Sequence, residues 1–153
     1  MYAEGTTVSV EKSRLEVEKI LSRYGATQRG VMLAEQCAQI AFVVEGAKYR
    51  IDVPLPHGDP EKPPPGWHAW DETRRERYRD SHHEQACRVR WRAIVLMLKA
   101  KLELIKLGLS TVEREFLADL VLPNGRTASQ CLPEIIRAGL TDPGVRQLGG
   151  GAP

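Results

Sequence analysis

A long segment with the period of a helix, residues 83–108, most constrains what this chain can fold into. At about 100° per residue, its apolar side chains fall on two faces, with lysine and arginine in narrow lines between them. The first face consists of Cys87, Trp91, Ile94, Leu98, Leu102 and Ile105, and the second of Val89, Ala93, Leu96, Met97, Ala100, Leu104 and Leu107. A helix that is apolar on two sides has to be covered on both, so we expect one continuous central helix. A sheet should cover the first face, and the C-terminal helices or a second copy of the protein the second.

The segment before this helix has first a helical and then a two-residue period. Ser9 is a typical N-terminal cap and Gly25 a typical stop for a helix between them. Apolar residues then alternate with their neighbours in residues 40–44 and 49–55, which predicts two strands joined by a short turn. A weaker strand at residues 28–34 completes a three-stranded antiparallel meander.

Three short elements are predicted after the long helix. A helix capped by Ser110 or Thr111 comes first, a strand at residues 121–122 second, and a helix at residues 129–138, ended by a glycine, last. Pro133 should lie in the first turn of the last helix, where its missing N–H is not needed, or bend it. The expected fold is therefore α+β, with an N-terminal helix, a three-stranded antiparallel meander, a long central helix and short C-terminal helices, in the order α-β-β-β-α-α-β-α.

The length of 153 residues fits a single domain, which we expect at residues 1–140, followed by a flexible tail at residues 141–153. Prolines and glycines predict a long loop at residues 56–70, either an irregular crossover or a functional flap. Two tryptophans at a helix-like spacing, as Trp67 and Trp70 are, are seldom exposed to open solvent. They should therefore fold the loop onto the domain or onto a partner.

Charge and cysteine content limit the compartment and the partners. Lysine and arginine number 22 and aspartate and glutamate 20, a net charge of +2, so a nucleic-acid signal would have to come from local clusters. No apolar run approaches the roughly 20 residues of a membrane span, and no apolar signal segment stands at the N-terminus. Three widely spaced cysteines without a Cys-x-x-Cys pair are typical of reduced thiols. We expect a cytoplasmic protein without a membrane partner.

No motif of a known catalytic or cofactor site is present. His83 and Cys87 stand four residues apart, a spacing that can hold a metal, but no second pair completes four ligands. A Gly-x-Ser-x-Gly elbow and a phosphate-binding glycine loop are both missing from the sequence. We therefore assign no catalytic residue, no metal site and no cofactor, and leave open whether the chain has an enzymatic activity.

The basic residues of the long helix are the strongest binding signal. Arg88, Arg92, Lys99 and Lys106 fall on one line of the helix, interrupted only by Glu103. Such a line can follow a phosphate backbone, and equally it can consist of long side chains that reach water from half-buried positions. Arg74, Arg75, Arg77 and Arg79 form an auxiliary patch, although acids between them are also typical of a solvated helix face. The aromatic residues that could stack on bases are Tyr49, Trp67, Trp70 and Tyr78.

Several short segments carry a resemblance to known sequences. They are VSVEKS at 8–13, RYGA at 23–26, VPLP at 53–56, WRA at 91–93, KAKL at 99–102, EFL at 115–117 and LPNGR at 122–126. Over most of its length the chain resembles a family of small, uncharacterised proteins of tailed phages and prophages. The resemblance implies a shared fold and a setting in the cytoplasm of a bacterial host, and it carries no established activity or catalytic residue. Small phage proteins of this kind often serve replication, recombination or counter-defence.

The expected order of elements is also that of restriction-endonuclease-like nucleases. Those enzymes hold a divalent ion with an acid on the second strand and an acid-x-lysine triplet on the third. Here Glu45, Lys48 and Asp52 stand at the wrong spacing for that set, so an active or, more in keeping with these residues, a degenerate nuclease is the third functional hypothesis.

Two other hypotheses rank ahead of the nuclease. The leading one is a phage-type accessory protein that binds single-stranded nucleic acid in replication or recombination, including strand annealing, through the basic line, the auxiliary patch and the aromatic residues. The second is a protein-binding or oligomerising module, such as an inhibitor of a host factor, because the second apolar face needs a cover. Both are compatible with a homo-oligomer, which we expect.

Overall fold

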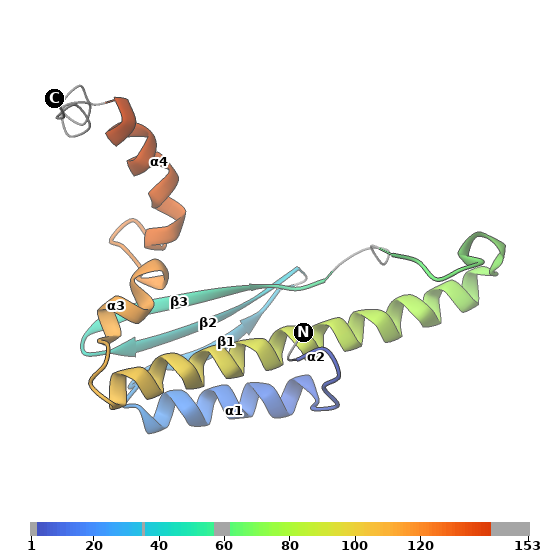
Figure 1. Ribbon diagram of the computed structural model, residues 1–153, viewed down its shortest axis with the longest axis horizontal. Coiled ribbons are helices and arrows are strands. Elements are labelled where there is room, and N and C mark those ends of the chain that lie inside the picture. Colours follow the sequence, from blue (N-terminus) through green and yellow to red (C-terminus); the bar gives the residue numbers. More distant parts are fainter. Residues whose placement is uncertain (1–2, 35, 57–61, 142–153) are drawn as a thin grey trace, which may run out of the picture.

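The computed structural model describes residues 3–34, 36–56 and 62–141 (Figure 1). The elements are α1 (Val10–Arg23), β1 (Arg29–Leu33), β2 (Cys37–Val44), β3 (Ala47–Pro54), η1 (Trp67–Ala69), α2 (Glu72–Lys106), α3 (Val112–Phe116), η2 (Leu117–Asp119) and α4 (Ala128–Thr141), where η1 and η2 are single 3-10 turns. Helices α1 and α2 run side by side against the sheet, while α4 projects away from it. The predicted α+β class, with its long central helix, is confirmed.

The sheet is the predicted antiparallel meander in the order β1-β2-β3. Side chains alternate along β2 between buried and half-buried, as expected for a sheet with one face on the core. Phe42 on β2 lies opposite Tyr49 on β3, and Ile40 lies opposite Ile51. These residues form the core with the apolar sides of α1 and α2, which places one face of the sheet against the two helices.

Helix α2 is continuous, as predicted, but it begins earlier than the apolar pattern indicated. Asp71 caps it, with Oδ1 accepting a hydrogen bond from the backbone N–H of Arg74 at 2.8 Å, so the mixed-charge segment 71–80 belongs to the same helix. Its 35 residues span about 52 Å at 1.5 Å per residue. Gly108, in the left-handed region with φ of 69°, follows its end. The buried positions are Cys87, Trp91, Val95, Leu98 and Leu102.

The first apolar face of α2 is largely as predicted, and its cover is the sheet together with α1. Val95 is fully buried although the pattern did not assign it to this face, because α1 widens the covered side of α2. Ile94 and Ile105, which were assigned to it, are partly buried at its border.

The prediction for the second apolar face is wrong where it gives the C-terminal helices as the cover. Part of this face is flanked by the N-terminal segment instead: Ala3 is 4% exposed, and the Gln85 side-chain amide donates to the carbonyls of Glu4 and Thr6. The C-terminal helices turn away because residues after α3 pair with β3, beyond the far side of the sheet. In the single chain, Ala93, Ala100, Leu104 and Leu107 are therefore exposed.

The C-terminal elements differ in detail from those predicted. The expected helix after Thr111 is split into α3 and η2, and the expected strand at 121–122 is reduced to isolated bridges, in which the N–H of Val121 donates to the carbonyl of Lys48. Helix α4 continues to Thr141 instead of ending at Gly139, and it starts early enough to place Pro133 in its second turn. The rest of the predicted tail, 142–153, and loop residues 57–61 lie outside the described residues.

Candidate functional site

The basic line of α2 is engaged in ion pairs within the chain. Arg88 pairs with Glu84 one turn before it. Arg92 and Lys99 both bind Glu16 of α1: Arg92 Nη1 lies 2.7 Å from Glu16 Oε2, and Lys99 Nζ donates to Oε1. The hydrogen bond from Lys99, supported by Arg92 and opposed by partial burial, lowers the pKa of Glu16. The positive charge on this side of α2 is therefore partly neutralised by the neighbouring helix.

The other basic side chains along α2 are also held by the chain, with Lys106 as an exception. Arg90 donates to the carbonyl of Pro54 at 2.6 Å, and Lys101 donates to the carbonyl of Glu115. Lys101 Nζ also lies 4.7 Å from the centre of the Phe116 ring, a cation–π contact that attaches α3 to α2. Lys106 is exposed and makes no ion pair within the described residues. The basic side chains along the body of α2 thus mainly join elements of the fold.

The auxiliary patch and the tryptophans form a cluster at the N-terminal end of α2. The rings of Trp67, Trp70 and Tyr78 lie 5.6 Å apart, centre to centre, in each pair. Arg74 lies over the Trp70 ring at 4.1 Å, and Arg75 donates to the carbonyls of Trp67 and, at 2.9 Å, of His68. The loop before α2 is thereby folded back onto the helix, one of the two outcomes expected for these tryptophans.

Within this cluster the four arginines differ in their surroundings. Arg79 pairs with Glu72 at 2.8 Å, and Arg75 is half-buried against η1. Arg74 and Arg77 are exposed, whereas Trp67 is only 8% exposed. Trp70 and Tyr78 keep partly exposed edges beside them. The cluster is therefore a small core of its own with two basic side chains at its surface.

The prediction that Tyr49 stacks on bases is wrong. Its side chain is 2% exposed and lies in the core, where its ring stacks on Phe42 at 5.4 Å and contacts Phe116 at 5.9 Å. Alternation along β3 places every second residue against the helices, and Tyr49 is one of them. A ring enclosed on this side has no face left for a base.

The side of α2 that points away from the core is an uncharged apolar stripe. We call it the outer stripe; it consists of Ala86, Val89, Ala93, Leu96, Ala100, Leu104 and Leu107. It extends over about 32 Å of helix at 1.5 Å per residue. The N-terminal segment borders it, leaving one groove with Lys62 and His82 at its rim and a second beside Thr6. A surface of this kind, apolar in the middle and polar at its rim, is typical of a protein interface.

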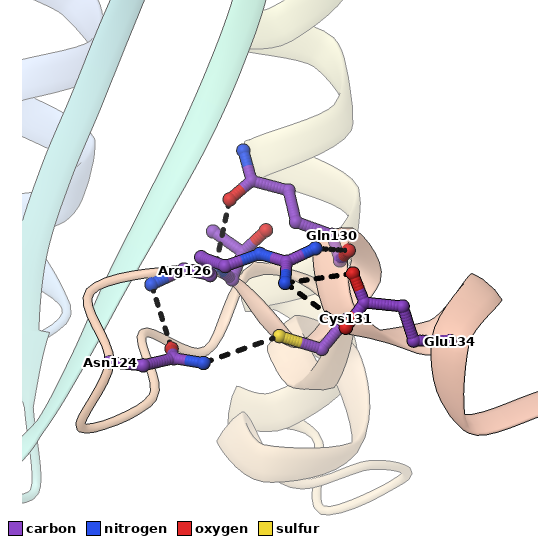
Figure 2. A network of polar contacts seen from close by, with 6 residues as sticks. Asn124, Arg126, Gln130, Cys131 and Glu134 are labelled. Carbon is purple, nitrogen blue, oxygen red and sulfur yellow. Dashed lines mark hydrogen bonds and ion pairs between the residues drawn. The ribbon is translucent and has the colours of Figure 1, made fainter. Parts of the chain in front are cut away.

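Helix α4 is a second exposed apolar element, and its base is firmly attached. Figure 2 shows the polar contacts there: Asn124 donates to Cys131 Sγ at 3.8 Å, and Arg126 binds the carboxylate of Glu134 at 3.0 Å and the carbonyl of Gln130. The Gln130 side chain in turn accepts from Arg50. Beyond this base, the apolar side chains of α4 are half exposed or more: Leu132, Ile135 and Ile136.

The residues considered for a metal or a nucleophile form no such site. Cys87 Sγ lies 3.5 Å from His83 Nε2, and burial raises the pKa of the thiol, which keeps Cys87 protonated at neutral pH. Asp52, weighed for a nuclease site, pairs with Arg50 at 3.3 Å on the outer face of the sheet. Among the residues that the structure describes, no group of three or more histidine, cysteine or acidic side chains could hold a metal ion. In the same part of the chain, no helix is long and apolar enough to cross a membrane.

The sequence did not reveal that Glu16 pairs with cations of α2, nor that the outer stripe remains partly exposed. Glu16 is separated from Arg92 and Lys99 by 76 and 83 residues, so no local pattern could reveal the pairing. The apolar positions of the outer stripe were visible in the sequence, but their exposure depends on where the C-terminal helices go.

Comparisons of the chain with models of protein families, with curated proteins and with solved structures found no match. The candidate site therefore has to be judged on its own geometry.

Proposed function

We propose that this chain is a protein-binding module, an accessory protein of a tailed phage or prophage, that acts through the outer stripe of α2. The observation that supports the proposal is an uncharged apolar helix face about 32 Å long, with four exposed and three half-buried side chains. Removing apolar surface from water contributes roughly 25 cal/mol of favourable free energy per Å². Such a face therefore favours association with another apolar surface. The phage setting is supported by the resemblance of the sequence.

Charge favours a protein over a polyanion as the partner along α2. A nucleic acid binds by replacing the counterions of its phosphates with free lysine and arginine side chains. Arg92 and Lys99, which border the outer stripe, already share one carboxylate. Breaking these ion pairs would cost part of the free energy that contacts with a phosphate contribute. An apolar partner surface needs no such exchange.

The proposal is tested by a charge placed in the outer stripe. Ala100 is exposed, so Ala100→Glu leaves the core intact, but it sets a carboxylate where a partner would have to desolvate it. With tagged wild-type protein in host extract, we expect at least one protein, this chain or another, to be retained and then lost with Ala100→Glu. Ser81→Glu, at an exposed position of α2 outside the outer stripe, is the matched control and should retain it. Equal retention by all three proteins would contradict the proposal.

Binding of single-stranded nucleic acid is a second candidate, favoured by the exposed Arg74 and Arg77 beside the partly exposed Trp70 and Tyr78. Here partly exposed aromatic edges and exposed cations lie together, as stacking sites require. If it holds, fluorescence anisotropy should show binding of a labelled oligonucleotide that weakens with salt. Arg77→Ala should reduce the affinity, and Arg90→Ala, at an arginine held by a backbone carbonyl, should leave it unchanged. Absence of binding at low salt would remove this candidate.

A further inference from the structure

We infer that the partner of the outer stripe is a second copy of the chain, with the two α2 helices packed antiparallel. The inference rests on the proposed function and specifies its partner. Three properties of the outer stripe support it: the alternation of large and small side chains around its centre, the pairing of the cations along its borders, and its position on the molecule.

The side chains of the outer stripe are spaced as in paired helices. Ala86, Ala93 and Ala100 recur every seven residues, with Val89 and Leu96 between them, which gives alternating steps of three and four residues. In an antiparallel pair whose two-fold axis passes between residues 94 and 95, Val89 faces Ala100 of the second copy and Leu96 faces Ala93. Val89 and Leu96 then each meet an alanine, so the two helices can approach closely around the axis, while Leu104 and Leu107 lie beyond this central contact, opposite Gln85 and His82. A parallel pair in register would set Leu96 against Leu96 and leave space between the alanines.

The borders of the outer stripe allow two identical surfaces to meet. Arg92 and Lys99 on one border would repel their counterparts if they were free, because like charges at an interface cost free energy. Each copy carries its own compensating Glu16, which binds both cations. On the opposite border, the guanidinium of Arg90 is fixed to the Pro54 carbonyl and directed toward β3. The three cations named here are therefore not free to pair with a strongly acidic partner, whereas a second copy needs no such charge.

The position of the outer stripe suits the antiparallel arrangement. The ion pairs of α1 with α2 involve Arg92 and Lys99, and the N-terminal half of α2 extends beyond α1 and the sheet (Figure 1). We call α1, the sheet and the part of α2 packed on them the body. In an antiparallel pair, the projecting half of each α2 lies beside the body of the other copy, and the two bodies lie at opposite ends. In a parallel pair, both bodies would lie at the same end, and the projecting halves would have only each other as neighbours.

The test uses the purified full chain without any other protein. Light scattering and sedimentation should give a dimer that dissociates on dilution, and Ala93→Glu and Ala100→Glu should each raise the dissociation constant about tenfold or more. Circular dichroism should show unchanged helix content, since both alanines are exposed. A chain that is monomeric at all concentrations would overturn the inference. If Ala100→Glu then still abolished retention of a host protein, the proposed function would stand with a different partner.

Engineered cysteines test the orientation. Under mild oxidation the double variant Val89→Cys with Ala100→Cys should form a disulfide-linked dimer, because these positions face each other only in the antiparallel pair. The single variant Ala100→Cys should form none beyond the wild-type background, which measures any linkage through the half-buried Cys37, since Cys87 and Cys131 are buried. A linked dimer from the single variant, or none from the double variant, would overturn the antiparallel arrangement.

Discussion

At the scale of single residues, Glu16 decides the electrical character of α2. One carboxylate binds two cations, and without it the helix would present a row of free positive charges next to an apolar stripe. The sequence showed the cations clearly, since their spacing along one helix is local information. It did not show their partner, because the pairing depends on how α1 packs against α2.

We expect Glu16→Gln to lower the free energy of unfolding by about 1 kcal/mol at pH 7, the value of one or two partly exposed ion pairs. The pKa of Glu16 is lowered in the folded chain, so its contribution is present above the ordinary value of 4.5 and is lost as the pH falls through the folded-state pKa. Urea unfolding at pH 7 and at pH 3 measures this. Glu18→Gln, at an exposed acid of the same helix, should have little effect. A difference between wild type and Glu16→Gln that did not shrink between pH 7 and pH 3 would contradict the assignment.

At the scale of elements, periodicity predicted α1, the three strands and α2 well, and it predicted the C-terminal elements less well. The strands could be predicted because one buried face imposes alternation, as in β2. The presence of helix α4 could be predicted from the sequence, but its attachment could not. It depends on Gln130, whose amide accepts from Arg50 at 3.0 Å and donates to Asp52 at 3.1 Å, two residues of β3.

We expect Gln130→Ala to loosen α4 without unfolding the body. The substitution removes the bonds to Arg50 and Asp52 and also the bond that the N–H of Thr127 donates to the same side chain. Protection of the α4 amides against hydrogen exchange should fall about tenfold, as expected from the loss of about 1.4 kcal/mol of local stability. Amides of α2 around Leu98 should keep their protection. Gln39→Ala, on the same face of the sheet, is the control, and equal protection of α4 in both variants would contradict this role of Gln130.

At the scale of the whole molecule, the layers of the fold were predictable and the covering of α2 was not. A helix with two apolar faces needs two covering elements, and the sheet is the only predicted element large enough to cover one of these faces. Which element covers the other depends on the direction of the chain after α3, and there the pairing of Val121 with Lys48 leads the chain away from α2. The same limit explains Tyr49: its aromatic ring is compatible with a ligand surface or a core, and only the packing of Phe116 against it decides.

The backbone contact between Val121 and Lys48 has another consequence, for aggregation. It occupies part of the outer edge of β3. Strand β1 forms the opposite edge of the sheet, and no described residue pairs with the outer side of β1. Edge-to-edge pairing between molecules is then easiest through β1 and is obstructed at the Lys48 end of β3. Two molecules that pair through β1 use up that edge, so further growth depends on the partly occupied edge of β3, which disfavours extension into a fibre.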